Sequence, residues 1–224
     1  MRVQGIIFDL DGTLYPLSDV LQMAYDMQVS FLASMLHISK SAAVKYLEEH
    51  HIYPTIRKDS HSATELFHEL GLDKSAWSTW RERRFDVTKI HRETATTSEI
   101  LYRFREFGPL ILLSSNSYTI IQKILQHIQV VPAVFDKIIC SDRYPCKGSF
   151  HKKQAMVAVL ELFGIDGPSL LSIGDRYETD IAPILELGGM GIHLHSVSGL
   201  PLLYQALRLQ DLKTCAEYTY YENQ

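Results

Sequence analysis

Two aspartates early in the sequence, Asp9 and Asp11, are the first residues whose types and spacing suggest chemistry. They follow an apolar run at residues 5–8 whose length suits a buried central strand, and Gly12 supplies the backbone freedom for a tight turn. Packing gives such a strand no reason to end in two carboxylates, because unpaired buried charge is costly. A divalent cation held by both would remove that cost. For this stretch alone, a polar turn of Asp and Gly is the simpler alternative.

A second pair of aspartates follows another apolar run, at residues 170–173. Gly174 precedes Asp175, so a buried strand again leads into a carboxylate on a Gly-containing turn, and Asp180 comes five residues later. Carboxylates gathered at one place repel each other and raise each other's pKa values, and a hard cation such as Mg²⁺ relieves that repulsion. The sequence therefore predicts a Mg²⁺ site. Its predicted ligands are Asp9, Asp11, Asp175 and Asp180.

Neutral donors and a lysine complete the set of candidate site residues. Ser115 and Asn116 follow an apolar run at residues 109–113, and both can donate to phosphate oxygens. They can also simply cap the next helix, and the two roles are compatible because a helix N-terminus binds anions. Lys147 lies near the start of a later helix, where the helix dipole disfavours a cation, which suggests an anion nearby. The predicted substrate-binding residues are Ser115, Asn116 and Lys147, with Lys152 and Lys153 as competitors of Lys147.

The elements that must position these residues fall into two classes. Residues 16–94 carry helical periodicity only, whereas strands and helices alternate from residue 95 onward. Alternation of this kind predicts an α/β fold, a doubly wound parallel sheet with helices on both faces. We expect residues 1–15 and 95–224 to form this core and residues 16–94 to form an inserted all-helical domain. Because ligands bind at the carboxyl ends of parallel strands, the polar strand ends should meet at one edge.

Bulk properties exclude several other classes of function. The 224 residues include 46% hydrophobic and 21% charged residues, with a net charge of −4 and no long basic run, so nucleic acid polymers are not expected partners. No stretch approaches the roughly 20 apolar residues of a membrane span. The three cysteines, Cys140, Cys146 and Cys215, lack zinc-ligand spacing, and Asp9 interrupts the early apolar run, unlike a signal peptide. We expect a cytoplasmic monomer or small homo-oligomer.

Together these residue types describe phosphoryl transfer. Asp9 would attack phosphorus and form an aspartyl-phosphate. Asp11 would protonate the leaving oxygen and then accept a proton from the water that attacks the intermediate. Mg²⁺ and Lys147 would offset the charge on the transferring group. The expected substrate is a small phosphorylated metabolite.

The chain resembles the haloacid dehalogenase (HAD) superfamily, because four of its segments look like the four motifs of that family and occur in the family order. The resemblance implies a Rossmann-like core. The resemblance implies Mg²⁺-dependent hydrolysis of phosphate esters, a metal ligand from the backbone carbonyl of Asp11, and a type C1 cap at residues 16–94 whose closing excludes water. Lys147 departs from the family pattern, because Gly148 rather than proline follows it. The motifs are residues 9–14, Ser115-Asn116, Lys147, and Gly174-Asp175 with Asp180.

A narrower resemblance links residues 8–16 and 64–73 to the pyrimidine 5′-nucleotidase group, which implies a nucleoside 5′-monophosphate as substrate. True haloacid dehalogenases lack the second aspartate, so Asp11 argues against halide release. A phosphomutase keeps all four motifs and stays open as an alternative. A receiver-like, non-enzymatic module phosphorylated on Asp9 also stays open, although a large cap would hide the surface that such a module must show to its partners.

Overall fold

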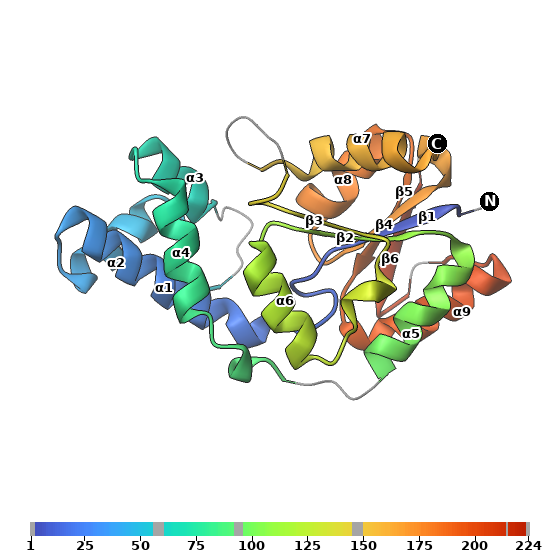
Figure 1. The fold of residues 1–224 in the computed structure, drawn as a ribbon, viewed down its shortest axis with the longest axis horizontal. Coiled ribbons are helices and arrows are strands. Elements are labelled where there is room, and N and C mark those ends of the chain that lie inside the picture. Colours follow the sequence, from blue (N-terminus) through green and yellow to red (C-terminus); the bar gives the residue numbers. More distant parts are fainter. Residues whose placement is uncertain (1–2, 56–60, 92–95, 145–149, 214, 223–224) are drawn as a thin grey trace. The chain divides into compact units, whose positions relative to one another are not determined.

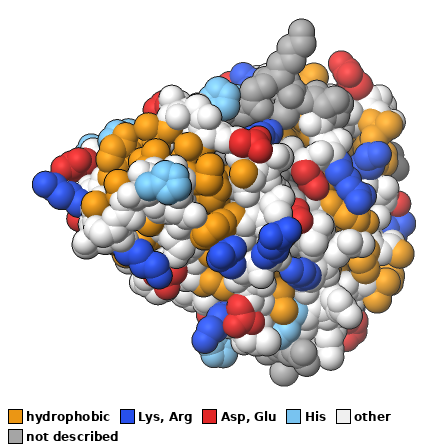
Figure 2. Space-filling model, turned by 60° about the vertical axis from the view of Figure 1, so that its left-hand side comes forward, with side chains coloured by type: hydrophobic (Ala, Val, Ile, Leu, Met, Phe, Trp, Pro, Cys, Tyr) orange, Lys and Arg blue, Asp and Glu red, His pale blue; other side chains and the backbone are white. Residues whose placement is uncertain are grey.

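The computed structural model describes residues 3–222, except residues 56–60, 92–95, 145–149 and 214. The chain forms two compact units, which we call the core unit (Met1–Leu17 and Ile90–Gln224) and the helical unit (Ser18–Lys89). Acidic and basic side chains are both spread over the face drawn in Figure 2, with apolar side chains exposed between them.

The core unit is built on one six-stranded sheet, with the strand order β3-β2-β1-β4-β5-β6 (Figure 1). The first five strands are parallel, which confirms the predicted α/β class, and β6 is antiparallel to β5. The sequence-based expectation did not include this last strand, although its aromatic and β-branched residues suit an edge strand. The strands are β1 (Gly5–Phe8), β2 (Leu110–Ser114), β3 (Lys137–Cys140), β4 (Leu170–Gly174), β5 (Met190–Leu194) and β6 (Tyr218–Glu222).

Helices cover both faces of the sheet. Two of them, α7 and α8, lie over one face, and the other three lie on the opposite side (Figure 1). Gly164, with φ of 62°, ends α7 in the left-handed conformation that glycine adopts without strain. The core-unit helices are α5 (Thr96–Phe104), α6 (Tyr118–His127), α7 (Lys152–Phe163), α8 (Ala182–Glu186) and α9 (Leu200–Leu209).

Strand β1 lies at the centre of the sheet, between β2 and β4. All four of its residues are buried, and they alternate between the two faces as a strand requires. Ile7 packs in a cluster with Met156 of α7, whereas the ring of Phe8 lies 5.3 Å from that of Phe104 in α5. Packing on both sides therefore fixes β1, and with it the position of Asp9 at its carboxyl end.

Among its described residues the helical unit has four α-helices, and three of them bring aromatic rings together. The rings of Phe31, Phe67 and Trp77 lie 5.0 to 5.1 Å apart. Ser62 and Asp73 accept hydrogen bonds from backbone N–H groups at the starts of the third and fourth helices, as helix caps do. Among the described residues, no helix combines the length and apolar composition that crossing a membrane requires. The helices are α1 (Ser18–Leu36), α2 (Lys40–Glu49), α3 (Ala63–Glu69) and α4 (Lys74–Arg84).

Candidate active site

Asp9 follows β1 directly and is buried, with 7% of its surface exposed. Its backbone N–H donates to the carbonyl of Ile173 in β4 at 2.9 Å, so the sheet ladder continues as far as this residue. The carboxylate is consequently held at the sheet edge by the backbone rather than by a mobile loop. This is the position in a parallel sheet at which ligands bind.

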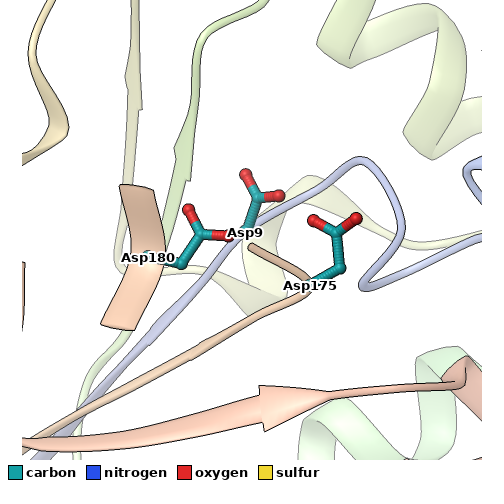
Figure 3. Close-up of side chains that lie close together, drawn as sticks. All are labelled: Asp9, Asp175 and Asp180. Atoms are coloured by element: carbon teal, nitrogen blue, oxygen red, sulfur yellow. The ribbon is translucent and has the colours of Figure 1, made fainter. Parts of the chain in front are cut away.

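Three of the four predicted metal ligands come together at this edge. Asp9, Asp175 and Asp180 each bring one carboxylate oxygen within 4.8 Å of the others, a group we call the carboxylate cluster (Figure 3). Asp175 follows β4, and Asp180 lies on the helical turn before α8. The Asp180 carboxylate accepts from the N–H of Arg176 at 3.0 Å and from the hydroxyl of Thr179 at 3.1 Å. These bonds fix its orientation within the cluster.

Two glycines allow the chain to approach this closely. A Cβ added at Gly12, where φ is +77°, would lie 2.3 Å from Oδ2 of Asp175. A Cβ added at Gly174 would lie 2.4 Å from the Cβ of Asp180. Both distances are far inside van der Waals contact, so a side chain at either position would push an aspartate out of place. The tight turn predicted at Gly12 is present, and a side chain at this position would also clash with Asp175.

Lys152 is the lysine that contacts the carboxylate cluster in the described part of the chain. It is the first residue of α7, and its Nζ donates to Oδ1 of Asp9 at 2.5 Å and to Oδ1 of Asp180 at 2.6 Å. Its side chain is only 10% exposed. The two carboxylates supply the anions that a lysine at a helix N-terminus needs. Lys147 lies outside the described residues, so its predicted role stays a prediction.

Burial sets the protonation behaviour of the cluster. It raises the pKa of Asp9 well above the usual value, which Lys152 only partly opposes while Asp180 and Asp11 add to the rise. Burial and the neighbouring Asp180 likewise raise the pKa of Asp175 to about 6. Burial alone would lower the pKa of Lys152, but the Asp180 and Asp9 carboxylates outweigh it and hold that pKa above the usual range.

The donor set of the cluster fits a hard divalent cation. It offers carboxylate oxygens alone, and Asp9 and Asp180 are buried while Asp175 is partly buried. Burial raises the pKa values of Asp9 and Asp175, and neighbouring carboxylates add to that rise. A cation in such a site would favour the charged carboxylates. Oxygen ligands in this number suit Mg²⁺, which keeps its remaining positions for water and substrate.

Asp11 lies on the same turn but in a different environment. Oδ1 of its carboxylate accepts a hydrogen bond from the hydroxyl of Tyr15, and Oδ2 accepts one from Nδ2 of Asn116 at 2.7 Å. Its side chain is only partly buried and is not a member of the carboxylate cluster. Metal binding by Asp11 therefore stays a prediction for its backbone carbonyl. Its carboxylate lies outside the cluster.

The predicted donors after β2 occupy contrasting positions. Asn116 is buried and reaches Asp11, whereas Ser115 is exposed directly after the end of β2. Two hydroxyls that the sequence analysis did not single out, those of Thr13 and Ser117, are buried and have no hydrogen-bond partner among the described residues. In the sequence, only the polar residue type could have marked Thr13 and Ser117 as candidate site residues.

Two further supports were not predicted. His193 of β5 donates from Nε2 to the backbone carbonyl of Asp175 at 2.8 Å, which holds the turn after β4. The backbone N–H and the hydroxyl of Ser141 both donate to the carbonyl of Asn116, each at 3.2 Å. The roles of His193 and Ser141 depend on which strands become neighbours, and local sequence patterns do not carry that information.

Comparison with known proteins agrees with this architecture. A HAD phosphatase from Thermococcus onnurineus matches with 19% identity and a TM-score of 0.61, over 91% of this chain and 97% of that chain. A haloacid dehalogenase-like family hydrolase from Xanthomonas campestris matches with 19% identity and a TM-score of 0.56, over 94% of both chains. These structures are similar in fold at low sequence identity. No curated protein matches the chain significantly.

The family assignment comes from the sequence itself. A model of haloacid dehalogenase-like hydrolases matches residues 3–188, a span that includes β1, β2 and β4 with all the polar strand ends described above. The match covers most of the chain and confirms the resemblance drawn from the motifs. The chain belongs to the family of haloacid dehalogenase-like hydrolases.

Proposed function

We propose that this hydrolase is a Mg²⁺-dependent phosphatase that cleaves a small cytoplasmic phosphate monoester through an aspartyl-phosphate on Asp9. One observation carries the proposal: the buried Asp9 carboxylate belongs to the carboxylate cluster and contacts the ammonium group of Lys152. A nucleophile that must approach an anionic phosphate needs positive charge beside it. The family match and the separate environment of Asp11 are consistent with this chemistry.

The proposed reaction has two steps. In the first, a carboxylate oxygen of Asp9 attacks phosphorus, the bond from phosphorus to the alcohol oxygen breaks, and Asp11 donates a proton to that leaving oxygen. In the second step, water attacks the phosphorus of the aspartyl-phosphate while Asp11 takes a proton from that water. Inorganic phosphate leaves, and the Asp9 carboxylate is restored. Lys152 remains protonated throughout and offsets the charge of the phosphoryl group.

Asp9, Asp175 and Asp180 are the residues that would hold Mg²⁺, with the Asp11 backbone carbonyl added by the family resemblance. When bound, the ion supplies positive charge to the phosphoryl oxygens. The chain itself prepares the site, because Gly12 and Gly174 leave room for the aspartates and His193 holds the Asp175 turn.

We further propose that the helical unit acts as a cap that selects the substrate. The point of insertion supports this, since the chain leaves the core unit soon after the Asp9–Asp11 turn and returns at Ile90. The narrower resemblance to pyrimidine 5′-nucleotidases makes nucleoside 5′-monophosphates the first substrate class to test.

A phosphate-release screen tests the proposed function. Purified protein would be incubated with nucleoside monophosphates, sugar phosphates, phosphoglycolate and p-nitrophenyl phosphate, each with Mg²⁺ and with EDTA. We expect release of phosphate from at least one ester, with Mg²⁺ only. Failure across the panel would contradict the phosphatase proposal. A stable phosphoenzyme without turnover would favour the receiver-like module, and conversion of one sugar phosphate into its isomer would favour the mutase.

A further inference from the structure

Tyr15 places a phenol hydroxyl on the proposed acid/base residue. Its side chain is 1% exposed, and its hydroxyl donates to Oδ1 of Asp11. The intervening turn is tight, because the N–H groups of Thr13 and Leu14 both bond to the carbonyl of Leu10 and the backbone pairs Asp11 with Tyr15. Turn and burial together fix where this hydroxyl points.

The other oxygen of Asp11 is held from an independent part of the fold. Nδ2 of Asn116 donates to Oδ2 at 2.7 Å. Asn116 is itself fixed, since its N–H donates to the hydroxyl of Ser114 at 3.2 Å and its carbonyl accepts two hydrogen bonds from Ser141. One donor on each oxygen prevents the carboxylate from rotating about its Cβ–Cγ bond. A carboxylate has about four acceptor positions, so two remain available for a proton and for a substrate atom.

The chemistry of these donors matches the task of Asp11. Both are neutral, so neither forms an ion pair that would have to be broken during proton transfer. When Asp11 gives its proton to the leaving oxygen it becomes an anion, and both donors already point at the oxygens that acquire the charge. Fixed donors directed at a developing charge assist a reaction without reorganisation. A phenylalanine would fill the same space without this contribution.

We propose that Tyr15 is a positioning residue that orients the Asp11 carboxylate for proton donation, and that its contribution grows with the basicity of the leaving alcohol. The inference rests on the proposed phosphatase function. Protonation matters little when the leaving group is already a stable anion, and it matters greatly for an alkoxide. The hydroxyl of Tyr15 therefore acts on some substrates and hardly on others, which a purely structural hydrogen bond does not do.

The test compares Tyr15→Phe with wild type on phosphate monoesters of increasing leaving-group basicity, from p-nitrophenyl phosphate through phenyl phosphate to an alkyl phosphate. We expect kcat/KM to change less than about twofold for the first and to fall about tenfold for the last. The quantity read is the slope of log kcat/KM against leaving-group pKa. Partial unfolding of the variant lowers every rate equally and leaves this slope unchanged.

Tyr25→Phe is the matched control, because Tyr25 is also a buried tyrosine, in the helical unit, whose hydroxyl has no hydrogen-bond partner among the described residues. Its slope should equal that of wild type. An equal loss on all esters, or no loss, in Tyr15→Phe would overturn the positioning role while leaving the phosphatase proposal intact. A wild type that hydrolyses none of the esters would overturn both.

Discussion

The two aspartates of the first turn, Asp9 and Asp11, differ in almost every physical respect although one residue separates them. Asp9 is buried among charged groups, with Lys152 and two other carboxylates as its neighbours. Asp11 is half-buried and accepts hydrogen bonds from the neutral Tyr15 and Asn116. Desolvation and charge suit a group that must receive an anion with metal help, whereas neutral donors suit a group that must exchange a proton. The two residues are of the same type, so their surroundings alone distinguish the two proposed roles.

The largest expected effect is the loss of activity when Asp9 is replaced. Asp9→Asn removes the proposed nucleophile while keeping the side-chain size, and kcat should fall at least about a thousandfold for every ester, because no aspartyl-phosphate can form. Steady-state phosphate release measures the loss. Intact-protein mass spectrometry after brief incubation with substrate should find no phosphorylated protein.

Asp11→Asn is the matched comparison for that variant. It should keep part of the activity on p-nitrophenyl phosphate, whose leaving group needs no proton, and it should accumulate phosphorylated protein because the second step lacks its base. Equal loss in the two variants on this ester, without a trapped intermediate, would remove the distinction between the two aspartates.

Lys152→Met should have the next largest effect, on stability. The substitution leaves Asp9 and Asp180 buried without their cation, which costs about 3 kcal/mol of unfolding free energy in metal-free protein. Chemical denaturation followed by circular dichroism measures this. Lys153→Met is the control, since Lys153 pairs with Glu186 at the surface and its loss should cost less than about 1 kcal/mol. Similar values for both variants would mean that the buried pairing contributes little.

A smaller effect, of opposite sign, is expected for Asp175→Asn without metal. The pKa of Asp175 is raised from 3.8 to about 6, so the folded state binds this proton more tightly than the unfolded state. The charged carboxylate therefore destabilises the folded protein, fully above pH 6, and the penalty disappears as the pH falls from 6 toward 4. The variant should melt a few degrees higher than wild type at pH 8, with the difference shrinking at pH 5.

With Mg²⁺ present, wild type rather than Asp175→Asn should have the higher melting temperature at pH 8. Added to wild type at pH 8, it should raise the melting temperature, because a ligand that binds only the folded state stabilises it. The same addition should leave Asp175→Asn nearly unchanged. Differential scanning fluorimetry with and without EDTA measures both. A variant that melts below wild type in EDTA would show that Asp175 supports the metal-free fold, contrary to its raised pKa.

Much of this site could be predicted from sequence because its aspartates stand directly after the strands that position them. An apolar run that ends in Asp9, and another that ends in Gly174-Asp175, identify buried strands with costly carboxylates at their ends. The rule that carboxyl ends of parallel strands share one edge then brings the carboxylates together, and the sheet order β2-β1-β4 agrees. Both steps use the residues within each strand and those directly after it.

What escaped prediction depends on partners that are distant in the sequence. The contact of Lys152 depends on α7 beginning at that residue. The sequence left Lys152 as a competitor of Lys147, which was favoured for its place near the expected start of this helix. Tyr15 reads as an ordinary core aromatic until Asp11 is found at its hydroxyl. Strand β6 exists because β5 offers it an edge, with five paired residues, and the tyrosine-rich tail alone does not show that edge.

The central position of β1 also has a consequence for the order in which the site can form. β1 precedes both of its neighbours along the chain, since β2 spans Leu110–Ser114 and β4 spans Leu170–Gly174. During synthesis the proposed nucleophile therefore emerges early and remains hydrated until β4 has been made. Pairings between such distant segments form slowly. The carboxylate cluster is thus among the last features to assemble, and a truncated chain ending before β4 would carry Asp9 without the surroundings that give it its chemistry.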